Sequence, residues 1–208
     1  MDRYLITHSL LSSWLYALKD NPYEGQTTER DSFAEFLKVL NREETETTSA
    51  MQMGIYFEDL VTDIVNGKGD ELHPWYEAAC KVAERVKGGR LQHKAYKEIE
   101  VAGMHVLLYG RLDALKAGVV YDIKFTSSYD VGKYYGSTQH PTYLEIVPEA
   151  HKFVYLVSNG TAVWTETYRR DETADIKSII SDFFEWLSAV GLMETYREKW
   201  LSKIKTEG

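Results

Sequence analysis

The sequence predicts an α/β fold with a central mixed β-sheet flanked by helices. Helical periodicity dominates up to about residue 90 and returns at about residue 172, whereas strand-like segments alternate with turn signals between about residues 94 and 168. The chain of 208 residues is 44% apolar and has only 4 prolines, which is enough to bury one hydrophobic core. We therefore expect residues 1–208 to form a single domain with a helical N-terminal part (about 1–90), a sheet core (about 94–168) and C-terminal helices (about 172–204).

The N-terminal part is expected to be helical throughout. Residues 1–20 contain an apolar stretch interrupted by serines, and we interpret them as a first helix because no small-residue cleavage site follows. Apolar residues recur at helical spacing over 57–65 and stop at the turn signal of residues 66–69. The next helix should run from about 74 to 87 and end at two consecutive glycines.

The central part is expected to form the sheet. Its strand-like segments are 95–102, 105–115, 119–125, 151–158 and 162–168. Only short breaks separate the first three, which predicts an antiparallel meander. The pair Asn159-Gly160 predicts a hairpin between the last two, and helices are expected between about 131 and 146.

The C-terminal part is expected to return to helices. Apolar residues there recur at the i, i+3, i+4, i+7, i+8 and i+11 positions of an amphipathic helix: Ile176, Ile179, Ile180, Phe183, Phe184 and Leu187. A last short helix should cover about 193–204.

Charge narrows the classes of function. The 24 Lys and Arg residues against 32 Asp and Glu residues give a net charge of −8, which argues against a protein that coats nucleic acid by bulk charge. A metal-dependent nuclease is compatible with this balance, because it concentrates carboxylates at its own site and takes its phosphate contacts from a local patch. One basic patch is present, and it has two equal interpretations, a solvated helix face or a DNA track: Lys81, Arg85, Lys87, Arg90, Lys94 and Lys97.

Absent motifs exclude several kinds of chemistry. The single cysteine, Cys80, supplies neither an internal disulfide nor an iron–sulfur cluster, and it favours a reducing cytoplasm. No apolar run approaches the roughly 20 residues of a membrane span, so we expect no membrane association. The sequence has no phosphate loop, dinucleotide fingerprint or serine-hydrolase elbow, and its six histidines show no zinc-binding spacing.

One strand carries charged residues in an apolar setting. In residues 119–125, alternation places Asp122 and Lys124 on the same face, where they either pair with each other at a surface edge or serve a function. The same tripeptide recurs as 175–177 within a predicted helix, so the tripeptide alone is a weak signal. The first copy differs because Asp113 lies nine residues upstream, where a meander turn would bring it beside Asp122. Two adjacent carboxylates repel, and a hard divalent cation, Mg²⁺ or Mn²⁺, would resolve that repulsion.

Four short motifs follow one another along the chain: Gly54–Glu58, Gly110–Asp113, Asp122–Lys124 and Gln139–Tyr143. In this order they resemble the motifs of the PD-(D/E)xK nucleases, and they are most similar to the RecB-like exonuclease branch with its phage relatives. The resemblance spans roughly residues 50–170 and implies a restriction-endonuclease-like core with a Mg²⁺- or Mn²⁺-dependent deoxyribonuclease activity. Leu112 stands where many members have proline, and the four cysteines of the cluster-bearing members are missing.

The resemblance implies roles for the catalytic side chains. Asp113 and Asp122 would bind the metal, with the backbone carbonyl of Ile123 as a further ligand. Glu58 would add a carboxylate from the flanking helix, and its alternative is an ordinary surface acid. Lys124 would orient or activate the attacking water and stabilise charge on the scissile phosphate, and its alternative is a simple ion-pair partner of Asp122.

The resemblance also implies residues on the substrate side. Gln139 and Tyr143 match the Q-xxx-Y motif, and Arg111 is a further candidate for substrate binding. Residues 151–155 offer a second match to that motif, but they are predicted to be a strand whereas the motif belongs on a helix. Tyr134, Tyr135 and Tyr143 are candidates for stacking on bases, with ordinary packing as the commoner role of tyrosine.

Together these observations predict a stand-alone, metal-dependent DNA nuclease, and an exonuclease in preference to a structure-specific endonuclease. Two further interpretations stay open, a catalytically silent nucleic-acid-binding protein with the same fold and a structural ion-pair network. DNA is the expected partner. A protein partner, contacted through the acidic segment 29–46 or a tyrosine-rich surface, and a homo-oligomer are also compatible with the sequence.

Overall fold

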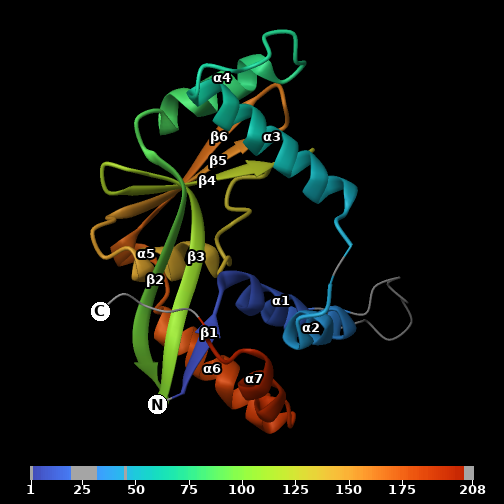
Figure 1. Ribbon diagram of the computed structural model, residues 1–208, viewed down its shortest axis with the longest axis vertical. Helices are drawn as coiled ribbons and strands as arrows, with labels where there is room; N and C mark the ends of the chain where they lie inside the picture. The colour runs from blue at the N-terminus through green and yellow to red at the C-terminus, as the bar shows by residue number, and fades with distance from the viewer. Residues whose placement is uncertain (1, 20–31, 45, 204–208) are drawn as a thin grey trace. The chain divides into compact units, whose positions relative to one another are not determined.

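The computed structural model describes residues 2–19, 32–44 and 46–203 (Figure 1). Its architecture is α/β, with a mixed six-stranded sheet flanked by helices, as the sequence predicts. Residues 29–31 and 45 of the acidic segment lie outside the described residues. In the part of the chain that is described, no helix is both long and apolar enough to cross a bilayer.

The strands are β1 (Arg3–Ile6), β2 (Arg90–Val101), β3 (Met104–Lys116), β4 (Val119–Phe125), β5 (Lys152–Ser158) and β6 (Val163–Arg169). The helices are α1 (His8–Lys19), α2 (Ser32–Asn41), α3 (Ser49–Val65), α4 (Tyr76–Val86), α5 (Gln139–Ile146), α6 (Ile176–Ala189) and α7 (Met193–Lys199), with a short 3₁₀ turn at Arg170–Glu172. The strand order is β1-β3-β4-β5-β6, and β2 pairs with β3.

The chain divides into two compact units of interleaved segments. One comprises the described residues of 1–45, 96–110 and 174–208, and the other comprises those of 46–95 and 111–173. Strands β2 and β3 contribute residues to both units. The expectation of a single domain stays a prediction.

The first unit corrects the expected N-terminal helix. Residues 3–6 form β1, which pairs in parallel with β3 from Arg3 opposite His105 to Ile6 opposite Leu108. Helix α1 starts only at His8, where the Thr7 hydroxyl accepts the Leu10 N–H at 3.3 Å as an N-cap. Before Thr7, Ile6 is buried and Tyr4 and Leu5 are half-buried in the strand instead of extending the helix.

Two other helices are shorter than predicted. Helix α5 begins at Gln139 and not near residue 131, where Gly132 has a φ of 84°, outside the helical region. Helix α7 ends at Lys199, and Leu201 forms an isolated antiparallel bridge with Tyr4. The amphipathic helix α6 forms as predicted, with the Asp175 carboxylate capping the Lys177 N–H at 3.0 Å.

The second unit is built on β4, β5 and β6. Strands β4 and β5 are parallel and joined through α5, whereas β5 and β6 form the antiparallel hairpin predicted at residues 159–160. Gly160 lies against Trp75, and a Cβ at this position would come within 2.4 Å of the indole ring. Helices α3 and α4 pack together over this part of the sheet (Figure 1). Their apolar residues form one core with side chains from β3, β4 and β5.

Candidate functional site

The two faces of β4 have different surroundings. Val119 is buried in the core with α3 and α4, and Tyr121, Ile123 and Phe125 pack against the same core. Residues at alternate positions of a strand point to opposite faces, so Val120, Asp122 and Lys124 face the other side. The alternation predicted from the sequence is therefore confirmed.

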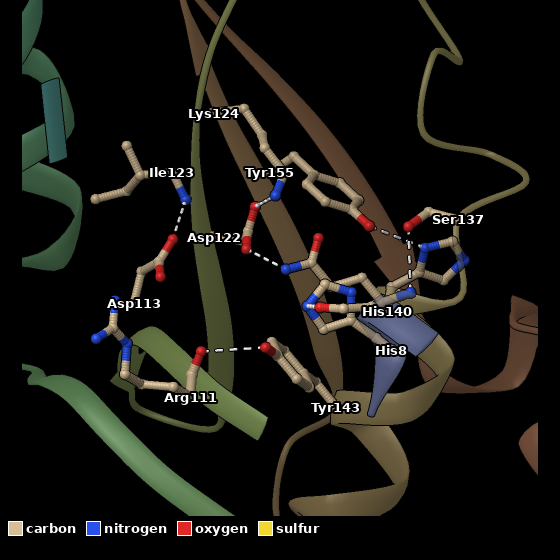
Figure 2. A network of polar contacts seen from close by, with 12 residues as sticks. His8, Arg111, Asp113, Asp122, Ile123, Lys124, Ser137, His140, Tyr143 and Tyr155 are labelled. Carbon is tan, nitrogen blue, oxygen red and sulfur yellow. Dashed lines mark hydrogen bonds and ion pairs between the residues drawn. The ribbon is translucent and has the colours of Figure 1, made fainter. Parts of the chain in front are cut away.

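Asp122 is the most buried acid of this region, with 3% of its surface exposed. Its Oδ1 accepts a hydrogen bond from the side-chain amide of Gln139, and its Oδ2 lies 2.8 Å from Lys124 Nζ (Figure 2). The Oδ2 contact is an ion pair without hydrogen-bond geometry, and that oxygen has no hydrogen-bond partner. A buried carboxylate oxygen without a hydrogen-bond donor can still accept a hydrogen bond or bind a cation.

Asp113 lies on β3, next to Asp122. The β3–β4 ladder pairs Ala114 with Tyr121, and one more step in the same register would bring Asp113 opposite Asp122. At this point the Asp113 Oδ2 accepts the Ile123 N–H at 2.7 Å (Figure 2). Burial raises the pKa of Asp113 well above its usual value, and the negative charges of Asp122 and Glu58 raise it further.

Lys124 remains a cation in this site. Burial lowers its pKa, but the carboxylate of Asp122 outweighs that effect, and the net pKa lies above the ordinary value. Its side chain as a whole is 31% exposed. Its Nζ also lies 5.9 Å from the centroid of the Tyr155 ring.

Glu58 on α3 belongs to the same electrostatic group. Burial raises its pKa, the amide of Gln92 and the charge of Arg111 lower it, and the charge of Asp122 raises it. The Gln92 amide donates directly to Glu58 Oε1. Sequence analysis did not identify Gln92, because no local pattern links β2 to α3.

Gln92 also has an unusual backbone. Its φ is 50°, in the left-handed region that residues other than glycine, asparagine and aspartate seldom adopt. It lies within β2, where the regular strand conformation would have been the default. Such strain often accompanies residues that hold a functional group in place.

The predicted substrate-side residues lie near these acids, but they do not all face solvent. Tyr143 is buried, and its hydroxyl donates to the Arg111 backbone carbonyl at 3.1 Å (Figure 2). Burial raises the pKa of Tyr143, so the phenol stays protonated. Tyr143 therefore anchors the backbone of β3 two residues before Asp113, while the Arg111 side chain is exposed.

The Q-xxx-Y motif is carried by a helix. Gln139 and Tyr143 both lie on α5, whereas residues 152–155 of the rival match at 151–155 lie on strand β5. His140 on α5 stacks on Tyr168 at 4.0 Å between ring centroids, and burial lowers its pKa to about 4. It is thus a neutral core histidine at physiological pH.

The three candidate stacking tyrosines have different environments. Tyr143 is buried, and Tyr134 stacks on Tyr155 at 4.4 Å between ring centroids. Tyr135 is 79% exposed. Tyr135 is therefore the one of the three whose ring faces solvent.

The basic patch is solvent-exposed where it lies within the second unit. Lys81 and Arg85 are exposed on α4, Lys87 follows that helix, and Arg90 and Lys94 are exposed on β2. Lys97 belongs to the other unit. Both interpretations of this patch remain predictions.

The residues of the site can be compared with what a hard cation requires. The carboxylates of Asp122 and Asp113 are hard oxygen donors, and their mutual repulsion would be relieved by a divalent cation. Among residues 2–19, 32–44 and 46–203, no three His, Cys, Asp or Glu side chains form a ready-made metal site. The donors thus fit a cation such as Mg²⁺ that keeps several water ligands, and Glu58 as a third carboxylate ligand stays a prediction.

Comparisons with known proteins bear on the fold alone. No protein-family model matches the chain, and a search of curated proteins gives no match. Among solved structures, the chain is similar to the crystal structure of SSO0001, with a TM-score of 0.52 and 15% identity over 89% of this chain and 77% of that one. At this identity the similarity supports the shared α/β architecture.

Proposed function

We propose that the protein is a metal-dependent deoxyribonuclease that hydrolyses phosphodiester bonds, with exonuclease action as the preferred mode. The observation that carries this proposal is the buried Asp122, which holds both Lys124 and Gln139 and lies beside Asp113. Burial of so many charged and polar groups costs free energy that a purely structural core would avoid. The single cysteine supports action in a reducing compartment such as the cytoplasm.

The carboxylates supply the metal-binding part of the proposed reaction. Asp113 and Asp122 would hold Mg²⁺ or Mn²⁺, with the Ile123 carbonyl and Glu58 as the further candidate ligands. When bound, such a cation polarises the phosphoryl oxygen and lowers the pKa of a coordinated water. The raised pKa of Asp113 means that cation binding would also displace a proton from this carboxyl.

The other side chains position the reacting groups and stabilise the negative charge of the phosphate. Lys124 has a raised pKa, so it acts as a cation that stabilises negative charge on the phosphate and orients the water, and not as a general base. Gln139 fixes the orientation of the Asp122 carboxylate through its amide. Tyr143 holds the β3 backbone that carries Asp113.

The decisive experiment measures cleavage of end-labelled linear single- and double-stranded DNA with and without about 5 mM Mg²⁺ or Mn²⁺. The test variants are Lys124→Ala and Asp122→Asn. The chain supplies matched controls in its second Asp-Ile-Lys tripeptide, Lys177→Ala on α6 and Asp175→Asn at the N-cap of that helix. We expect metal-dependent release of short products, reduced by about 100-fold or more in the test variants and unchanged in the controls.

Two results would contradict the proposal. One is the absence of cleavage on every DNA substrate, and the other is cleavage that persists in both test variants. Cleavage of circular DNA at a rate equal to that of linear DNA would identify the endonuclease alternative. These assays distinguish all the enzymatic outcomes with one set of proteins.

A second candidate is a nucleic-acid-binding protein without catalysis. It is favoured by the Lys124–Asp122 ion pair, which occupies two of the proposed catalytic groups. Such a protein would bind DNA equally well with Mg²⁺ and with a chelator. The nuclease should instead show cleavage only with the metal.

A further inference from the structure

The loop between β4 and α5, residues 126–138, is held firmly against the sheet although it contains no helix or strand. The buried carboxylate of Glu166 on β6 accepts hydrogen bonds from the Tyr134 N–H at 3.0 Å, from the Tyr129 hydroxyl at 2.6 Å and from the Tyr168 hydroxyl. Burial together with Glu166 raises the pKa of Tyr129 to about 12, so this donor keeps its proton. A charged acceptor with several donors is a strong anchor for a loop.

The loop is also closed on itself. Lys133 Nζ donates to the Thr126 hydroxyl at 3.0 Å and to the Ser128 carbonyl at 2.9 Å. These contacts tie the middle of the loop to its beginning, directly after β4. The conformation of the tip is therefore fixed from two sides.

A series of aromatic rings connects this loop with Lys124. The Lys124 ammonium lies over the Tyr155 ring, Tyr134 stacks on Tyr155 with 20° between the ring planes, and Tyr129 lies beside Tyr134 at 6.4 Å between centroids. Trp164 continues the series at 5.4 Å from Tyr129. The Tyr155 ring is fully buried and Tyr134 is half-buried, so the packed rings connect the loop to the proposed catalytic lysine.

The tip of this anchored loop exposes apolar side chains. Val131 is 94% exposed and Tyr135 is 79% exposed, and only Leu72 is comparable among the large apolar side chains of the described residues. Single exposed apolar residues are common on protein surfaces. Here two exposed apolar residues lie on one anchored loop. Tyr135 directly follows Tyr134, whose ring stacks on the Tyr155 ring that Lys124 contacts. A ligand explains this arrangement better.

We propose that Tyr135 stacks on an unpaired base of single-stranded nucleic acid, with the adjacent phosphate directed toward Lys124. This inference rests on the proposed function and specifies its substrate class as single strands or frayed ends. A tyrosine ring can stack on any base, because every base has a π-face, whereas the faces of paired bases inside a duplex are already covered. Tyr135 would hence bind a single strand without reading its sequence.

The test uses binding alone, so that it does not depend on catalysis. A dye-labelled oligothymidylate of about 12 nucleotides and a duplex of equal length are titrated with the protein in the presence of a chelator, and fluorescence anisotropy is measured. The variants are Tyr135→Ser, which removes the ring, and Tyr135→Phe, which keeps it. Leu72→Ser is the matched control for loss of an exposed apolar side chain.

We expect Tyr135→Ser to weaken binding of the single strand by between about fivefold and about a hundredfold. Tyr135→Phe and Leu72→Ser should stay within about twofold of the wild type, and duplex binding should change little in any variant. Single-strand affinity that is unchanged in Tyr135→Ser, or a wild type that binds no single strand, would overturn the proposal that Tyr135 stacks on a base. Cleavage by the wild-type protein then decides separately whether the nuclease proposal stands.

Discussion

Gln139 and Asp122 are joined by a buried hydrogen bond that connects helix α5 to strand β4. The Gln139 amide donates to Asp122 Oδ1, and both side chains are almost fully buried. The other oxygen of the same carboxylate faces Lys124. The orientation of the central acid of the site therefore depends on an amide from a different secondary-structure element.

The hydrogen bond between Gln139 and Asp122 should contribute to the free energy of unfolding. Gln139→Ala leaves a buried carboxylate oxygen without its donor, which should cost about 1–3 kcal/mol in the free energy of unfolding. The measurement is urea denaturation at pH 7. The control is Gln52→Ala at a half-buried position of α3 outside the site, which should change the midpoint little. An equal effect of the two variants would contradict this role of Gln139.

Asp113 should make stability depend on pH. Its raised pKa means that the folded protein binds a proton at this carboxyl in a pH range where the unfolded chain has already released it. The contribution of Asp113 to stability is thus greatest below about pH 4 and falls as pH rises through the folded pKa.

Asp113→Asn removes this dependence, and its amide oxygen can still accept the Ile123 N–H. The variant should therefore gain stability relative to the wild type as pH increases from about 4 to neutral, while losing nuclease activity. Urea denaturation of both proteins across this range provides the measurement. A difference in stability that does not change with pH would rule out the buried carboxyl as its source.

Metal binding should be detectable without any cleavage assay. Mg²⁺ at about 100 times its dissociation constant should stabilise the folded protein by about 2.7 kcal/mol and raise the midpoint of thermal unfolding. The increase should be lost in Asp113→Asn and Asp122→Asn but kept in Asp175→Asn. An equal increase in all these proteins would point to binding outside the site.

The strained backbone of Gln92 can be separated from its contact with Glu58. Gln92→Gly relieves the φ of 50° but removes the amide, whereas Gln92→Ala keeps the strain and also removes the amide. Gln92→Gly should consequently be more stable than Gln92→Ala by about 1–2 kcal/mol. Both variants should require more Mg²⁺ for half-maximal cleavage, if Gln92 positions Glu58, and an unchanged Mg²⁺ requirement would limit Gln92 to a structural role.

Much of the fold follows from local sequence patterns. Alternation over residues 119–125 predicts which residues of β4 face the core, the pair at 159–160 predicts the β5–β6 hairpin, and helical spacing predicts α6. Each pattern depends on neighbours within a few residues, where backbone geometry alone fixes the periodicity. The same patterns brought Asp113, Asp122 and Lys124 into one hypothesis.

Only the tertiary structure decided which distant residues meet. Residues 3–6 became a strand because β3, about a hundred residues later, offers a parallel partner, and this pairing overrides the local helical tendency. Likewise the contacts of Gln92 with Glu58 and of Gln139 with Asp122 join residues that no periodicity relates. Sequence by itself determined the elements and the chemical types of the candidate residues, whereas long-range packing decided how those side chains are partnered, since that depends on contacts between segments far apart in the chain.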